Sequence, residues 1–262
     1  VFPKFLLNTP EFSTTRAELA QKSVDAILDF GEKGFPGILV ETIAIFINNL
    51  AAPANTKVFS LTHRLHLTQP QAYIFDPELP YWIIYRNQLF DSVCRKLDFD
   101  VFEVFRDRQL TNKLLSSSGE LRVLKSRNLS DDGKAILDIP GYDSYISYAA
   151  AKPLSVFQYL DAPNVYLTPN MTYKPRMMKK PPHCVVNGSL AILIPKGGIV
   201  PTEKQLAYFS SEEYRAFYQI ARNFQTRSLN VDACSVFFYG LLRDEAKPAP
   251  EKFDTSVQLS FL

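Results

Sequence analysis

The stretch Asp29-Phe-Gly-Glu-Lys-Gly-Phe35-Pro-Gly37 joins two apolar runs and decides how the N-terminal part of the chain folds. The run before it, Ser23–Phe30, and the run after it, Leu39–Asn48, are rich in branched apolar residues and predict two buried strands. The glycines and the proline between them predict a tight loop. Because the connection is so short, the two strands are expected to be antiparallel neighbours.

Upstream, the sequence predicts one more strand and one helix. Val1–Leu7 is apolar enough for a buried strand. Thr9 and Pro10 have the residue types of a helix cap and of a first helical position, so a helix is expected over Phe12–Lys22. The order strand, helix, strand, strand (β-α-β-β) predicts an α/β fold with a partial, mostly parallel sheet. Because these elements are too few for a complete doubly wound domain, the chain is expected to be part of a longer protein.

A second region is expected after Leu50–Lys57, whose alanines and proline predict a linker. Beyond it, prolines and aromatic residues multiply and the hydrophobic periodicity weakens. The expected domains are residues 1–57, the end of an α/β domain, and residues 58–262, a mixed α+β domain. The elements expected in the second domain are helices at Leu89–Leu97 and Ser155–Leu160, a strand at Leu190–Pro195, two helices within Thr202–Arg222, and a strand at the end of Asn230–Leu241.

Composition bounds the kinds of site that the chain can carry. It has 262 residues, of which 46% are hydrophobic, and a formal net charge of +2, too small to indicate nucleic acid by itself. Cys94, Cys184 and Cys234 lie far apart, which predicts a reducing cytoplasm without disulfides or a zinc site. His63 and His66 have no nearby carboxylate or third ligand in a metal-like pattern, so no metal is expected. No apolar run reaches the roughly 18 residues of a membrane span, so no membrane partner is expected.

Positive charge is concentrated in three acid-poor stretches, Phe105–Asn128, Tyr173–Lys196 and Arg215–Asn230. Such clusters can neutralise phosphates, and the polar residues among them can hydrogen-bond phosphate oxygens or base edges. The alternative is a solvated charged surface, and the sequence leaves both open. The candidate DNA-binding residues are Arg106, Arg108, Gln109, Thr111, Asn112, Lys113, Lys125, Arg127, Asn128, Tyr173, Arg176, Arg222, Gln225 and Arg227. Phosphate contacts are expected of Arg106, Arg108, Lys125, Arg127, Arg176 and Arg227, and base contacts of Gln109, Asn112 and Asn128.

Phe35 is an aromatic residue on the loop between two buried strands. In that position its ring can project from the sheet edge and stack on a flat ring, such as a base taken out of the duplex. Packing of the ring under its own loop is the alternative, and loop spacing alone favours it.

These residues resemble the adenine-N6 DNA methyltransferases of restriction–modification systems. In that family a strand similar to Val1–Asn8 follows the catalytic strand, and a helix, an Asp-Phe-Gly-Glu-like strand, a loop with Phe-Pro and a strand similar to Glu41–Ile47 come next. The downstream counterparts lie in the family's target-recognition domain, at Arg122–Asn128, at Asn187-Gly-Ser-Leu and in the helical run Phe209–Arg222.

The resemblance implies a role in catalysis for one residue, Phe35, as the aromatic that stacks on the flipped target adenine. It also implies S-adenosylmethionine as the cofactor of the intact enzyme and double-stranded DNA as a partner. The family's Asn/Asp-Pro-Pro-Tyr/Phe motif and its glycine-bearing cofactor loop are absent, and Asn8-Thr-Pro10 and Asp161-Ala-Pro-Asn do not match that motif. This chain alone is therefore expected neither to bind the cofactor nor to transfer a methyl group, and a missing N-terminal catalytic segment or subunit is an expected partner.

The expected function is DNA sequence recognition and positioning of the target adenine, as part of a site-specific adenine-N6 DNA methyltransferase. A DNA-binding specificity module without its own catalysis is the alternative. A third possibility, a nuclease, lacks support because Glu203-Lys204 and Glu251-Lys252 have no flanking strand pattern of the nuclease type.

Overall fold

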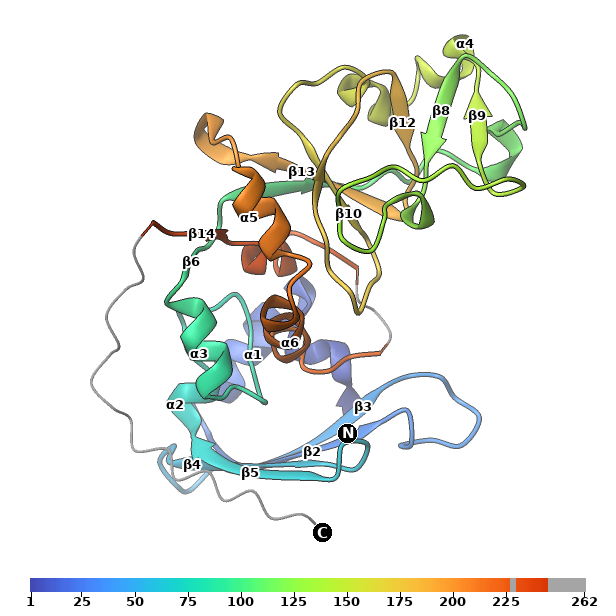
Figure 1. Ribbon diagram of the computed structural model, residues 1–262. Coiled ribbons are helices and arrows are strands. Elements are labelled where there is room, and N and C mark those ends of the chain that lie inside the picture. The colour runs from blue at the N-terminus through green and yellow to red at the C-terminus, as the bar shows by residue number, and fades with distance from the viewer. Residues whose placement is uncertain (227–229, 245–262) are drawn as a thin grey trace. The chain divides into compact units, whose positions relative to one another are not determined.

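The computed structural model describes residues 1–226 and 230–244 and shows a mixed α/β protein with several sheets (Figure 1). The chain divides into two compact units. The described part of unit 1 comprises residues 1–96 and 217–226, and that of unit 2 comprises residues 97–216 and 230–244. Unit 2 is therefore inserted in the chain of unit 1.

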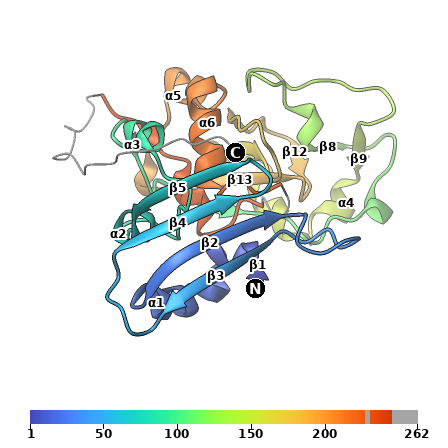
Figure 2. The same ribbon diagram turned by 90° about the horizontal axis from the view of Figure 1, so that it is seen from below.

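Unit 1 is built on a five-stranded mixed sheet in the order β1-β3-β2-β4-β5, and Figure 2 shows β3, β2, β4 and β5 side by side. β2 is antiparallel to β3, as the short loop between them predicts, and parallel to β4. The strands are β1 (Phe2–Pro3), β2 (Ser23–Gly31), β3 (Thr42–Asn48), β4 (Asn55–Ser60) and β5 (Leu65–Pro70). The helices are η1 (Lys4–Leu7), η2 (Pro10–Phe12), α1 (Ser13–Ala20), α2 (Gln71–Ile74) and α3 (Gln88–Cys94), where η denotes a 3-10 helix.

The expected strand Val1–Leu7 is wrong beyond its first residues, because the chain turns into η1 after Pro3. Lys4 explains the turn. Its backbone N–H donates to the carbonyl of Glu41 at 2.7 Å, and its buried ammonium lies 2.7 Å from Asp29 Oδ2 and 3.8 Å from Glu41 Oε1. A buried charge requires such partners, so the turn is set by residues far along the chain.

The expected linker Leu50–Lys57 is also wrong at its end, because β4 begins at Asn55 and pairs with β2. The sheet of unit 1 continues through β5, and the first stretch of this unit ends at Lys96. The expected domain boundary after residue 57 therefore falls inside the sheet and does not coincide with either unit.

Unit 2 contains three small sheets, ordered β11-β10-β13-β7, β12-β8-β9 and β14-β6. Their strands are β6 (Leu97–Asp98), β7 (Phe102–Phe105), β8 (Leu121–Leu124), β9 (Ser144–Ile146), β10 (Tyr166–Pro169), β11 (Met178–Lys179), β12 (Cys184–Val186), β13 (Leu190–Pro195) and β14 (Leu241–Leu242). The helices that begin in it are η3 (Asn112–Leu114), η4 (Ser126–Asn128), α4 (Tyr148–Ala151), η5 (Ser155–Tyr159), η6 (Lys196–Gly198), α5 (Glu203–Tyr208), α6 (Glu212–Ala221) and η7 (Ser235–Phe238).

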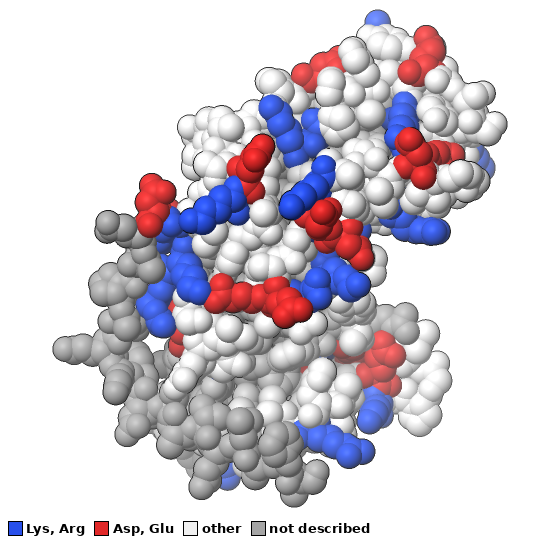
Figure 3. All heavy atoms as spheres, viewed as in Figure 1, with Lys and Arg blue, Asp and Glu red and all other residues white. Residues whose placement is uncertain are grey.

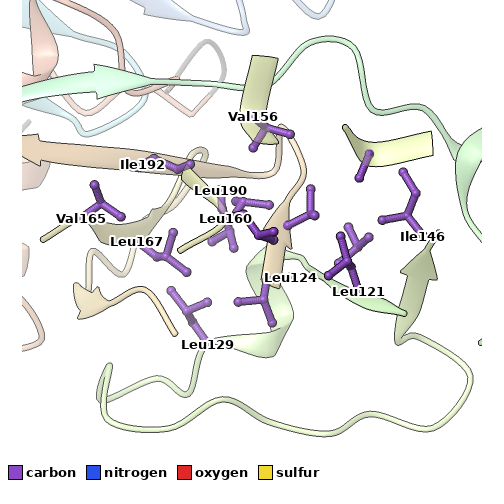
Figure 4. Close-up of a cluster of buried hydrophobic side chains, with 14 residues drawn as sticks. Leu121, Leu124, Leu129, Ile146, Val156, Leu160, Val165, Leu167, Leu190 and Ile192 are labelled. Atoms are coloured by element: carbon purple, nitrogen blue, oxygen red, sulfur yellow. The ribbon is translucent and has the colours of Figure 1, made fainter. Parts of the chain in front are cut away.

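Two of these sheets share one apolar core, shown in Figure 4. β8 and β9 contribute Leu121, Leu124 and Ile146, while Leu190 and Ile192 come from β13. Fully burying such a side chain stabilises a fold by about 1.5–3 kcal/mol. The core therefore fixes the strand ends of unit 2, from which its loops extend.

The expected strand at Leu190–Pro195 and the division of Thr202–Arg222 into two helices are confirmed. Thr202 begins α5 with a reciprocal cap, in which its hydroxyl accepts from the N–H of Gln205. Ser211 similarly accepts from the N–H of Tyr214 at the start of α6. These elements could be predicted because residues within or next to them determine where they begin.

Candidate nucleic-acid interface

Loops from both larger sheets of unit 2 meet at one edge. β7 and β10 are both antiparallel to β13, so their carboxyl ends lie beside the start of β13. β8 is parallel to β12, and only three residues separate β12 from β13. We call the resulting set of loops the loop edge and define it as Arg106–Leu110, Lys125–Ser130, Asn170–Lys174 and Asn187–Ser189.

Direct contacts join the four loops. The N–H of Asn170 donates to the carbonyl of Ser189 at 2.9 Å, and the N–H of Ser126 donates to Ser189 Oγ at 3.0 Å. A Cβ atom added to Gly188 would lie 2.6 Å from the carbonyl oxygen of Asp107. Two of the three downstream stretches that carry the resemblance, Arg122–Asn128 and Asn187-Gly-Ser-Leu, are therefore in contact through Ser126 and Ser189.

Asn170 lies at the centre of this edge, and sequence reasoning missed it. Its buried amide donates to the carbonyl of Gly188 at 3.1 Å and to Asn230 Oδ1 at 2.9 Å, and it accepts from the N–H of Val231 at 3.0 Å. Arg106 Nη1 donates to its oxygen at 3.4 Å. Burial, followed by the nearby charge of Arg108, lowers the pKa of Arg106.

Asn128 supports the loop from inside, and the structure contradicts its expected role in reading a base edge. It is 0% exposed. Its amide donates to the carbonyl of Leu137 at 3.0 Å and to Asp143 Oδ1 at 2.6 Å, and accepts from the N–H of Lys125 at 3.0 Å. No side-chain polar group of Asn128 faces solvent for a base to contact.

Arg176 was also expected to face DNA, but it is buried and holds loops together. Only 8% of it is exposed. Its Nη2 donates to the carbonyls of Ser126 and Leu129, at 3.2 Å each, and its Nη1 donates to the carbonyl of Lys174 at 3.1 Å. Burial lowers its pKa. The expected phosphate contact of Arg176 is therefore wrong in this conformation.

Lys125 and Arg127 share one aromatic ring, that of Tyr142. Lys125 Nζ lies 3.9 Å from the ring centroid and donates to the carbonyl of Tyr142 and to Ser144 Oγ. The guanidinium carbon of Arg127 lies 4.7 Å from the same centroid, and the residue is exposed. Burial lowers the pKa of Lys125, against the attraction of Asp143 and with the repulsion of Arg127.

The remaining predicted residues of unit 2 are exposed on the segment that follows β7 and on the loop after β10. Asp107 shapes the first of these by accepting from the N–H of Leu110 at 2.8 Å. Gln109 uses its side-chain oxygen to accept from the N–H of Ser155 at 2.7 Å. On the face seen in Figure 3, Lys and Arg side chains lie interspersed with Asp and Glu, without one large basic patch. The exposed predicted residues in this group are Arg108, Gln109, Thr111, Asn112, Lys113 and Tyr173.

Three of the predicted residues lie in unit 1. Phe35 is 46% exposed on the loop between β2 and β3 in unit 1. Arg222 and Gln225 are buried in unit 1, where Gln225 accepts from Asn8 Nδ2 at 2.7 Å, so neither side chain faces solvent. Arg227 lies outside the described residues.

A buried polar network in unit 1 was also missed. Asp29 Oδ2 accepts from the hydroxyl of Tyr85 at 2.5 Å and pairs with Lys4. Beside this network is a pocket of about 430 Å³, whose lining includes Lys4, Glu41 and His63. Burial, followed by the charge of Lys4, lowers the pKa of His63. The spacing of these residues in the sequence does not indicate the polar network, because Lys4, Asp29 and Tyr85 come from separate parts of the chain.

Comparisons with known proteins do not identify the chain: no protein-family model and no curated protein matches it. Within residues 1–226 and 230–244, no group of three or more His, Cys, Asp or Glu side chains is placed to hold a metal ion. None of the helices in the same residues has the length and apolar character needed to cross a bilayer.

Proposed function

We propose that unit 2 recognises double-stranded DNA through the loop edge, and that the chain positions a target adenine as part of a site-specific adenine-N6 DNA methyltransferase. One observation carries the proposal. Four loops from two sheets meet at one edge and present Arg108, Arg127 and Tyr173 to solvent. Binding residues are disproportionately found on loops that a rigid scaffold positions.

The chemistry of this edge suits a nucleic acid. Arginine side chains neutralise phosphates and can form two parallel hydrogen bonds to guanine, and aromatic rings stack on bases or sugars. Beneath them, Asn128, Asn170 and Arg176 bond to the backbone of the loops and hold their shape. An edge that is already ordered loses less conformational entropy on binding.

Phe35 supports the second part of the proposal. Its loop is fixed near both ends by Thr226, whose hydroxyl donates to Glu32 Oε1 at 3.0 Å and whose N–H donates to Glu41 at 3.0 Å. A half-exposed ring on an anchored loop can stack on a base that has left the duplex, since unstacking costs only a few kcal/mol.

No step of methyl transfer is assigned to this chain, because the residues that the structure describes do not fit the methyl donor. In the pocket of unit 1, Glu32 and Glu41 accept hydrogen bonds from Thr226, and the buried ammonium of Lys4 pairs with Asp29. The motifs that the family uses for the cofactor and for the adenine amino group do not occur in the sequence. In the proposal the chain supplies recognition of the DNA and the stacking ring.

Selection from a pool of random duplex DNA tests the proposal. The full chain is incubated with the pool at low and at moderate salt, and bound sequences are read. The double variant Arg108→Ala, Arg127→Ala is compared with Lys152→Ala, which removes an exposed cation beside α4, at the opposite end of β8 and β9 from the loop edge.

The wild type and Lys152→Ala are expected to enrich one short motif that contains adenine. The double variant is expected to lose about tenfold or more in affinity at moderate salt, since it removes two contacts to DNA. Absence of binding by the wild type at low salt, or equal losses in the double variant and in Lys152→Ala, would refute recognition through this edge.

A further inference from the structure

Arg127 differs from Arg108 because an aromatic ring holds its side chain. Its guanidinium carbon lies over the Tyr142 ring, 4.7 Å from the centroid, so the charged group rests on an aromatic ring. Within the described part of the chain, no hydrogen bond or ion pair uses its N–H groups. The side chain is exposed, so a ligand can reach them.

The backbone that carries Arg127 is fixed as well. The residue before it donates its N–H to Ser189 Oγ, and its carbonyl accepts from Arg176. The residue after it is the buried Asn128, whose side chain accepts from the N–H of Lys125. Both the loop and the guanidinium group are therefore ordered before any ligand binds, which favours a directional contact over a diffuse one.

Lys125 adds positive charge at the same place without competing for the same contact. Its ammonium lies on the Tyr142 ring and donates to Ser144 Oγ and to the carbonyl of Tyr142. Its proton donors are thus turned toward the protein, while its charge favours a ligand atom rich in electrons. Arg127 is left as the forked donor.

We propose that Arg127 reads a guanine in the major groove, with two parallel N–H groups donating to O6 and N7. Guanine is the base that presents two acceptors side by side there, and arginine is the side chain whose fork matches them. An exposed arginine without a supporting aromatic ring, such as Arg108, fits a phosphate equally well, because phosphates accept from many directions. The assignment rests on the proposed DNA-binding function of unit 2 and names the specificity of one residue within it.

The test compares two arginine variants of the full chain in selection from random duplex DNA and in binding at several salt concentrations. Arg127→Ala is expected to lose the preference for one guanine of the selected motif, by about 5- to 150-fold. Its salt dependence stays close to that of the wild type. The matched control, Arg108→Ala, keeps the motif, and the slope of log affinity against log salt falls by about 0.9.

Two further variants separate the fork from the charge. Arg127→Lys keeps the charge but not the two parallel donors, so it is expected to lose the same guanine preference. Tyr142→Leu removes the supporting ring and is expected to weaken that preference while Arg127 is still present. Circular dichroism spectra matching the wild type show that each variant is folded.

The outcomes that overturn the assignment are distinct from those that overturn DNA binding. If Arg127→Ala retains every position of the motif, or if its salt slope falls as in Arg108→Ala, Arg127 contacts a phosphate and DNA binding stands. Binding by the wild type without any enriched motif removes the guanine contact and the sequence specificity of the proposed function, while binding to DNA stands. A wild type that does not bind at low salt refutes the proposed function and this assignment together.

Discussion

Replacement of Asn128 by alanine tests the interpretation that this residue is structural. The side chain is fully buried and makes three hydrogen bonds, so its removal is expected to destabilise unit 2. The N–H of Lys125 loses its acceptor, at a cost of about 1–3 kcal/mol for a buried group left unsatisfied. The lost bond to the Asp143 carboxylate adds roughly 1.5–3 kcal/mol.

These two terms do not add fully. Asp143 keeps the N–H of Ile139 at 3.0 Å and Arg122 Nη2 at 2.9 Å, and the carbonyl of Leu137 keeps Arg122 Nη2 at 2.8 Å. We therefore expect a loss of roughly 3 kcal/mol in the free energy of unfolding, toward the lower part of the summed range.

Urea denaturation followed by far-ultraviolet circular dichroism measures this loss. Asn112→Ala is the matched control, because Asn112 is exposed on η3, and it is expected to change stability by less than about 0.5 kcal/mol. Trp82, the single tryptophan of the chain, is buried in unit 1, so its fluorescence reports on that unit separately. If Asn128→Ala is as stable as Asn112→Ala, the side chain does not support the loop.

Three further predictions follow from contacts in each unit. Gly188→Ala is expected to separate the loops after β7 and β12 and to destabilise the chain by about 1–3 kcal/mol, because the new Cβ would lie 2.6 Å from the carbonyl oxygen of Asp107. Thermal unfolding measures this loss of stability, with Ser117→Ala, a substitution in an exposed loop, as the control, and equal melting temperatures would contradict the contact. Burial raises the pKa of the Cys94 thiol to about 12, so at pH 8 its reactive thiolate is expected to be about a thousandfold scarcer in the folded protein than in urea. Alkylation followed by mass spectrometry measures the rate of reaction in both states, and equal rates would refute the burial effect. If the chain is part of the proposed methyltransferase, Phe35→Ala in that enzyme is expected to weaken flipping of the target base, which fluorescence of 2-aminopurine at the target position records. An unaltered signal would remove the proposed stacking role.

The fold could be predicted from the sequence wherever neighbouring residues determine it. β2 and β13 are short apolar runs with turn residues at their ends, and α5 has its cap within the first four residues. β4 was missed because its strand character comes from pairing with β2, about thirty residues earlier in the chain. The division into units was missed for the same reason, since the return of the chain to unit 1 after residue 216 depends on contacts between distant segments.

The candidate site was predictable in composition but not in detail. The sequence singled out a stretch around Arg106 and another around Asn187, and the structure places the two in contact. It could not separate arginines that bond to buried carbonyls, such as Arg176, from arginines that face solvent, such as Arg127. Both kinds have the same charge and similar neighbours in the sequence, and only the packing of the loops distinguishes them.

The loop edge is held largely by polar side chains, and this bears on how it would discriminate among DNA sequences. Asn128 and Asn170 are buried amides that bond to specific backbone groups of the loops, so each allows one arrangement of the loop it holds. Apolar side chains of the same size would fill the space without fixing those directions. Affinity for phosphates depends mainly on the number of cations and tolerates small displacements, whereas a two-bond contact to a base does not. Substitutions of these amides that leave unit 2 folded are therefore expected to reduce the preference for particular bases before they reduce binding to DNA in general, and the reverse order would indicate that the edge contacts only the DNA backbone.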